Sequence, residues 1–209
     1  MIKSLDNILN NETKVKILRL FTSRMERYHA SGREIARLIG VTAPTAHAAL
    51  KELYAHHILD YEISGRNHLY NLDRKNRIVK DMLLPIFQKE YAFKKDVFTF
   101  IKNAIEKRKI TENIVSVLFY GSQQDEKADE TSDVDIAIIV QNENDFKIVE
   151  DIFIEDITSS FYDYFGTSLD VYIKTKQEFI RRLKKNLPPV STLIKSYSVI
   201  YGKDPSSWK

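Results

Sequence analysis

The spacing of hydrophobic positions changes along the chain. Over most of the first 109 residues, apolar side chains recur every three or four positions, as in a helix with one buried face. From residue 113 onward, short apolar runs of strand length alternate with helical segments. We therefore expect an α+β protein in three parts: an N-terminal domain at 1–75, a helical linker at 76–112, and a C-terminal domain with a small mixed sheet at 113–209.

The pattern of the N-terminal part predicts three helices followed by a hairpin. Apolar residues between 15 and 21 have helical spacing, residues 31–34 form a capping box, and Thr42 is a suitable N-cap for the third helix. Two short apolar runs at 58–63 and 68–72 are joined by a Ser-Gly-Arg-Asn stretch, which favours a turn. We expect these two runs to pair as strands.

This order of elements resembles the winged helix-turn-helix family of bacterial and archaeal regulators over about residues 12–73. The resemblance implies binding to double-stranded DNA through the third helix and the hairpin. That helix has no Arg, Asn or Gln, which make the best contacts to base edges, so we expect contacts to phosphate. Arg66 suits a minor groove, but a solvated arginine in a turn is an equal alternative. The expected DNA-binding residues are Thr42, Thr45, His47, Lys51 and Arg66.

The predicted linker carries a continuous apolar stripe that needs a partner. Pro85 predicts a kink in this helix, because proline removes one hydrogen bond and clashes with the preceding turn. Three partners for the stripe stay open: the C-terminal domain, the N-terminal domain or a second copy of the chain. A homodimer is therefore one expectation. The stripe consists of Phe93, Val97, Phe100, Ile101 and Ala104.

The C-terminal part predicts a compact sheet with helical connections. A helical crossover normally makes its two flanking strands parallel, so the second and third predicted strands should begin at the same end of the sheet. The predicted strands are 114–120, 134–140 and 169–174, and the predicted helices are 145–164, 177–185 and 190–197.

Three carboxylates and a Gly-Ser turn are expected to meet at one edge of this sheet. Asp133 and Asp135 are two positions apart at the start of a strand, so their side chains point to the same side. Asp170 opens the next strand, at the same end of the sheet. If the first strand runs antiparallel to the second, Gly121 and Ser122 at its C-terminal end lie there too.

Carboxylates this close together require cations, because like charges raise one another's pKa. We therefore expect two Mg²⁺ ions held by Asp133, Asp135 and Asp170, which would orient a triphosphate and activate an acceptor hydroxyl. Gly121 lets the backbone approach a phosphate, and Ser122 can donate its hydroxyl and N–H to it. A lone Asp-x-Asp is common where a loop enters a strand, so the prediction depends on the combination.

These residues resemble the DNA polymerase β-like nucleotidyltransferase superfamily, and within it the minimal nucleotidyltransferases, some of which act as antitoxins by adenylylating a toxin protein. Gly121, Ser122, Asp133 and Asp135 match the family motif, and Asp170 matches its third carboxylate. The resemblance implies transfer of a nucleoside monophosphate, AMP being the first expectation, from an NTP such as ATP to an acceptor hydroxyl. A protein acceptor such as a toxin is one implied partner.

One departure from the family motif supports a second hypothesis. Relatives continue Gly-Ser with a small residue, an arginine and a glycine, whereas residues 123–130 here carry four acids and only one cation, Lys127. Cations for a triphosphate would have to come from Lys174, Lys176 or the basic cluster at 181–185. The alternative is a DNA-binding transcriptional regulator whose nucleotidyltransferase-like domain is a nucleotide sensor or an inactive scaffold.

Acidic and basic residues are unevenly distributed in the C-terminal domain. Residues 113–174 carry 14 Asp or Glu against 3 Lys or Arg, whereas residues 175–209 carry 2 Asp or Glu against 8 Lys or Arg. Such a division suits a metal site with polyanionic ligands nearby, although surface variation is an alternative.

The chain has no cysteine, which fits a reducing compartment, and no apolar run of membrane-spanning length, so we expect a cytoplasmic protein without a membrane partner. His56, His57 and His68 are expected to have packing or polar roles.

Overall fold

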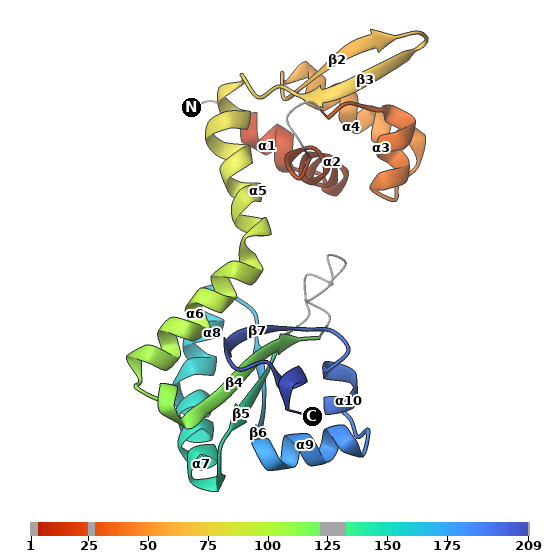
Figure 1. Ribbon diagram of the computed structural model, residues 1–209. Helices are drawn as coiled ribbons and strands as arrows, with labels where there is room; N and C mark the ends of the chain where they lie inside the picture. Colours follow the sequence, from red (N-terminus) through yellow and green to blue (C-terminus); the bar gives the residue numbers. More distant parts are fainter. Residues whose placement is uncertain (1–3, 25–27, 122–132, 209) are drawn as a thin grey trace. The chain divides into compact units, whose positions relative to one another are not determined.

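The computed structural model describes residues 4–24, 28–121 and 133–208 (Figure 1). Ser122 and the acidic segment 123–130 lie outside these ranges. The chain forms two compact units, one at Met1–Lys94 and one at Lys95–Lys209. Each unit is described by itself.

The first unit is a winged helix-turn-helix fold, as predicted. Asn11, Ser31 and Thr42 cap its three main helices by accepting hydrogen bonds from backbone N–H groups of the first turn. The short strand β1 and the hairpin β2–β3 form an antiparallel sheet in the order β1-β3-β2. The elements are α1 (Ser4–Leu9), α2 (Glu12–Thr22), β1 (Ala30–Ser31), α3 (Gly32–Leu38), α4 (Ala43–Ala55), β2 (Leu59–Ser64) and β3 (Asn67–Leu72).

The core of this unit forms where the apolar faces of α2, α3 and α4 meet the sheet. Its members include Ile17, Leu18, Leu50 and Leu53, which are fully buried. Lys14 of α2 is also buried, and its ammonium group donates to the carbonyl of Asn7 at 2.7 Å and to Oδ1 of Asn10 at 3.1 Å, and forms an ion pair with Glu52 of α4. A buried lysine is tolerated because its charge and its donors are all engaged.

The predicted linker divides between the two units. A π-helical turn (Val79–Leu83) leads directly into α5 (Leu84–Tyr91), where Pro85 occupies the first turn. The distortion therefore precedes the proline, and the helix ends at Ala92, after which α6 (Phe93–Lys107) begins. In the first unit, α5 packs on α2 through an ion pair between Arg19 and Glu90 at 2.6 Å.

The second unit is built on a four-stranded mixed sheet in the order β6-β5-β4-β7 (Figure 1). Strands β5 and β6 are parallel, while β4 is antiparallel to both of its neighbours. The parallel pairing of β5 and β6 is the one that the helical crossover predicted, and the antiparallel direction of β4 meets the condition set for Gly121. The elements after α6 are β4 (Ile114–Tyr120), β5 (Val134–Val140), α7 (Glu143–Ile152), a π-helical turn (Phe153–Ile157), α8 (Thr158–Phe165), β6 (Leu169–Thr175), α9 (Lys176–Lys184), α10 (Val190–Leu193) and β7 (Tyr197–Gly202).

Helices cover both faces of this sheet. On one face, Phe98 of α6 contacts Phe119 of β4 with ring centroids 5.6 Å apart, and Phe100 contacts Phe161 of α8 at 5.4 Å. The apolar stripe of α6 therefore packs within the second unit. On the other face, residues such as Leu118 and Ile139 of the sheet pack against Phe179, Val190 and Leu193 of α9 and α10.

One prediction for the C-terminal region is wrong. The helix expected at 190–197 ends at Leu193, and Tyr197–Gly202 forms β7, which pairs with β4. Gly202 has φ +80°, and a β carbon there would overlap the carbonyl of Val115. Close approach of the two backbones thus requires glycine at this position. No helix within the described ranges is long and apolar enough to cross a membrane.

Candidate active site

Asp135 and Asp170 lie side by side at the start of two parallel strands. They are register partners in the β5–β6 ladder, so their side chains leave the same face of the sheet. Asp133 directly precedes β5 and is exposed. The predicted gathering of the three aspartates at one edge of the sheet thus agrees with the strand register.

Gly121 lies at the same end of the sheet as these aspartates, directly after β4, the other neighbour of β5. It follows β4, whose last residue Tyr120 is the register partner of Asp135. Gly121 has φ +86°, and a β carbon there would overlap Oδ2 of Asp135 and lie 2.8 Å from its Cγ. Only glycine fits both the backbone conformation and the space. Ser122, the other half of the predicted phosphate-binding turn, lies outside the described residues.

The electrostatics of this edge are those of crowded acids. Burial raises the pKa of the Asp135 carboxyl, and the neighbouring charges of Asp170 and Asp133 raise it further. Burial and the charges of Asp135 and Asp170 also raise the pKa of Tyr120 to about 12. Tyr120 therefore stays protonated at neutral pH and can donate a hydrogen bond beside the carboxylates.

A family model described as "Polymerase beta, Nucleotidyltransferase" matches residues 101–206, just over half of the 209-residue chain. The chain belongs to this family. The nucleotidyltransferase domain thus comprises α6, the mixed sheet and its helices, with the acidic edge formed by β4, β5 and β6. No curated protein matches the chain.

The acidic edge of the nucleotidyltransferase domain has donors of the right chemistry for Mg²⁺. Carboxylate oxygens are preferred Mg²⁺ ligands, and the pKa of Asp135 is raised first by burial and then by the charges of Asp170 and Asp133, which a cation would offset. As the side chains stand, no three Asp, Glu, His or Cys residues in the described part of the chain form a group that could hold a metal ion. Asp135 and Asp170, with Asp133 beside them, are the carboxylates that would hold a cation at this end of the sheet.

Several basic residues of the nucleotidyltransferase domain contact neighbouring side chains. Arg181 and Arg182 of α9 both donate to Glu178, at 2.8 Å and 2.9 Å. Lys176 lies over the ring of Trp208, 5.2 Å from its centroid. Of the predicted phosphate-neutralising residues, Lys174 is on β6, on the same side of the strand as Asp170.

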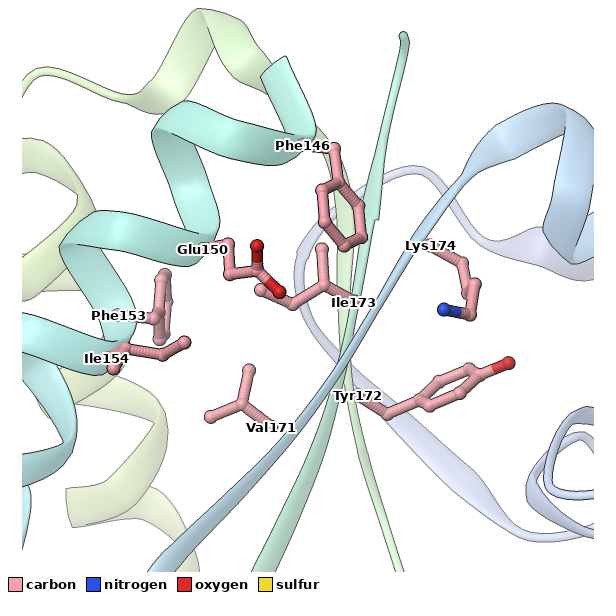
Figure 2. Close-up of a pocket in the computed structure, with 8 residues that line it drawn as sticks. All are labelled: Phe146, Glu150, Phe153, Ile154, Val171, Tyr172, Ile173 and Lys174. Carbon is pink, nitrogen blue, oxygen red and sulfur yellow. The ribbon is translucent and has the colours of Figure 1, made fainter. Parts of the chain in front are cut away.

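A small cavity at the outer edge of β6 was not predicted from the sequence (Figure 2). It has a volume of about 210 Å³ and lies between β6 and α7. Val171 and Ile173 point to the helix side, whereas Tyr172 and Lys174 point to the other side of the strand. The Tyr172 hydroxyl is buried and has no hydrogen-bond partner among the described residues. Sequence alone gave no signal for this edge, because its strand pattern does not say which strand is outermost.

The predicted DNA-binding residues are all exposed on the winged unit. Thr45, His47 and Lys51 lie on the outward surface of α4, and Arg66 lies at the turn between β2 and β3. Thr42 accepts a hydrogen bond from the backbone N–H of Thr45 at 3.3 Å, so it also caps the helix. The structure therefore places these residues on two neighbouring elements of one fold.

The hairpin also carries an aromatic cluster that the sequence analysis did not single out. Tyr61 of β2 stacks on His68 of β3 with centroids 4.2 Å apart and planes at 11°. Tyr54 of α4 lies 4.8 Å from Tyr61, and Tyr70 lies 5.8 Å from it. His68 therefore has the packing role that was predicted. The ring side chains of His68 and Tyr70, two positions apart in β3, were the signal available for this cluster.

Three solved structures that are similar to part of the chain are described as those of possible or established transcriptional regulators. A homodimeric winged helix-turn-helix DNA-binding domain from Mycobacterium bovis, a possible ArsR-family regulator, is 18% identical and covers 44% of this chain and 79% of that one, with a TM-score of 0.36. A possible transcriptional regulator from Methanosarcina mazei is 13% identical, covers 44% and 80%, and has a TM-score of 0.33. An ArsR-family regulator is 16% identical, covers 44% and 93%, and has a TM-score of 0.32.

Proposed function

We propose that this protein is a cytoplasmic, Mg²⁺-dependent nucleotidyltransferase that moves a nucleoside monophosphate from an NTP to an acceptor hydroxyl, and that its winged unit tethers it to DNA. ATP and AMP transfer are the first choices for the nucleotide. The observation that carries the proposal is the juxtaposition of Gly121, Asp135 and Asp170 at one edge of the sheet. A hydroxyl of a partner protein is the acceptor class to test first.

The reaction balances as a substitution at phosphorus. The acceptor oxygen forms a bond to the α-phosphorus, the bond between that phosphorus and the α,β-bridging oxygen breaks, and pyrophosphate leaves. Asp170, which is exposed, would take the proton of the acceptor hydroxyl. Mg²⁺ bound by the aspartates would supply charge neutralisation for the triphosphate.

The residues of this chain have separable roles in the proposal. Gly121 lets the backbone pass directly over Asp135, so a phosphate can approach main-chain N–H groups there. Asp133, Asp135 and Asp170 would hold the cation. Tyr120, neutral up to a pKa of about 12, is available to donate a hydrogen bond to a phosphate oxygen.

Label transfer tests the enzymatic proposal. The protein is incubated with α-labelled ATP, Mg²⁺ and candidate protein acceptors, alongside a variant that carries Asp133→Ala and Asp135→Ala. We expect labelled acceptor with the unmodified protein and none with the double variant. Transfer that survives both substitutions, or its absence with each of the four NTPs and every acceptor, would reject the proposal.

The second candidate is a DNA-binding regulator with a nucleotide-sensing domain. It is favoured by the contacts of Arg181 and Arg182 with Glu178, which engage two of the cations expected to neutralise a triphosphate. If the protein is such a regulator, its affinity for duplex DNA should fall steeply as the salt concentration rises. NTP should change that affinity without being converted to product. Absence of DNA binding even at low salt would exclude it.

A further inference from the structure

Strand β6 has an unpaired outer edge. It is the last strand in the order β6-β5-β4-β7, and among the described residues it pairs only with β5. The carbonyl of Ser168 accepts from the N–H of Val134 at 2.9 Å. The main-chain groups of Ser168 and of every second residue after it therefore face β5. By alternation, the N–H and C=O groups of Val171 and Ile173 face outward. These groups have no strand partner among the described residues.

The sequence of β6 is complementary to itself when it is reversed about Tyr172. In an antiparallel pair of two copies centred on Tyr172, Val171 of one copy lies opposite Ile173 of the other, and Asp170 lies opposite Lys174. Opposite charges and apolar β-branched residues are favourable in such cross-strand positions. Tyr172 would face its own counterpart in a non-hydrogen-bonded pair, where two Cα atoms are about 4.5 Å apart.

Two side chains at this edge, Lys174 and Ile154, are at least partly exposed in one copy. The Lys174 ammonium nitrogen lies over two aromatic rings, 5.3 Å from the centroid of Tyr172 and 5.7 Å from that of Phe146. Ile154, which lines the adjoining cavity, is 65% exposed. A lysine on an edge strand usually discourages pairing with other chains. In the pairing about Tyr172, however, Lys174 of one copy lies opposite the acidic residue Asp170 of the other.

We propose that two copies of this chain pair through β6, antiparallel about Tyr172, and that Lys174 of one copy reaches Asp170 of the other. The pairing joins two four-stranded sheets into one continuous sheet. It also brings a cation from the second copy to the acidic edge, where the chain's own arginines are engaged by Glu178. The interface does not depend on the enzymatic proposal.

Single cysteines test the register, because the chain has none of its own. Tyr172→Cys places two thiols across the twofold axis within reach of a disulfide, whose Cα atoms are usually about 4.4–6.8 Å apart. Lys174→Cys is the matched control on the same side of the same strand, since its two copies would be four strand positions apart. Under mild oxidation we expect Tyr172→Cys to form a covalent dimer at least about ten times faster than Lys174→Cys.

A mixed sample makes the test independent of any single variant's folding. Asp170→Cys alone and Lys174→Cys alone should each stay unlinked, whereas an equimolar mixture of the two should form a covalent heterodimer. Equal rates for Tyr172→Cys and Lys174→Cys, or no heterodimer in the mixture, would overturn the proposal. Failure of label transfer from ATP would leave the cross-linking result unchanged, so the two proposals fail separately.

Discussion

Gly121 passes so close to Asp135 that no β carbon can be placed between them. The end of β4 and the start of β5 are therefore fixed against each other at the acidic edge, and the glycine is required by both its positive φ and its neighbour. This pair is the most specific part of the candidate site.

Gly121→Ala should destabilise the protein more than the same change at Gly166. Both glycines have positive φ, +86° and +70°, but a β carbon at Gly166 meets nothing within 4 Å. The strain of positive φ should cost about 1 kcal/mol at either position, and overlap with Asp135 should add about 1–3 kcal/mol at Gly121. Urea denaturation of the two variants measures this difference. Equal losses would show that Asp135 moves away without cost.

Asp135→Asn should raise the free energy of unfolding at neutral pH. The pKa of Asp135 is raised in the folded protein, so its ionisation costs stability as pH rises from the unfolded pKa through the folded one, and the cost persists at higher pH. Removing the charge removes that cost, and the difference between the two proteins should vanish at pH values below the unfolded pKa. Unfolding measured from pH 3 to 8 checks the sign; Asp151→Asn, at an exposed position on α7, is the control.

Mg²⁺ should reverse the ranking of the same two proteins. If Asp135 helps to hold the cation, Mg²⁺ stabilises the unmodified protein by mass action and leaves Asp135→Asn nearly unchanged. Thermal unfolding at increasing Mg²⁺ measures this, with Ca²⁺ as a comparison ion. Equal upward shifts in both proteins would place the cation elsewhere.

Tyr120→Phe should flatten the loss of stability at high pH. The pKa of Tyr120 is raised to about 12, so the folded protein holds this proton more tightly than the unfolded chain. Stability should therefore fall between the ordinary tyrosine pKa and about 12, and this fall should be smaller in the variant. Unfolding at pH 9 to 11.5 tests it. Tyr162→Phe, at a position 57% exposed, is the control and should keep the original slope.

Lys51→Ala and Arg66→Ala should weaken DNA binding and reduce its dependence on salt. Each lost phosphate contact lowers the slope of log affinity against log salt by about 1. Lys80→Ala, an exposed lysine outside α4 and the hairpin, should leave the slope unchanged. Titrations of a labelled duplex at several salt concentrations provide the measurement. A slope unchanged by Lys51→Ala and Arg66→Ala would assign DNA contacts to another surface.

Much of the fold followed from the sequence because its signals were local. The cap residues Ser31 and Thr42 fixed two helix starts, and the helical crossover between β5 and β6 made these strands parallel, which brought Asp135 beside Asp170. Strand β7 was missed because the apolar residues around it also fit the end of a helix. Its identity depends on Gly202 approaching Val115, a contact far apart in sequence.

The environment of the site was less predictable than its members. The carboxylates were named from spacing alone, but the raised pKa of Tyr120 depends on burial and on two acids from other strands. The free edge of β6 likewise depends on strand order. Arg181 and Arg182 suited a phosphate in the sequence, and only the helical geometry shows that Glu178 engages both.

The division of the long helical stretch at Ala92 has a practical consequence. Phe87 is buried in the core of the winged unit and Val97 is buried in the nucleotidyltransferase unit, only ten positions later. Almost every helical turn between Phe87 and Val97 therefore belongs to the first unit or to the second. A truncation that separates the two units should therefore fall within this short stretch, because a cut placed elsewhere removes residues that pack in one of the two cores.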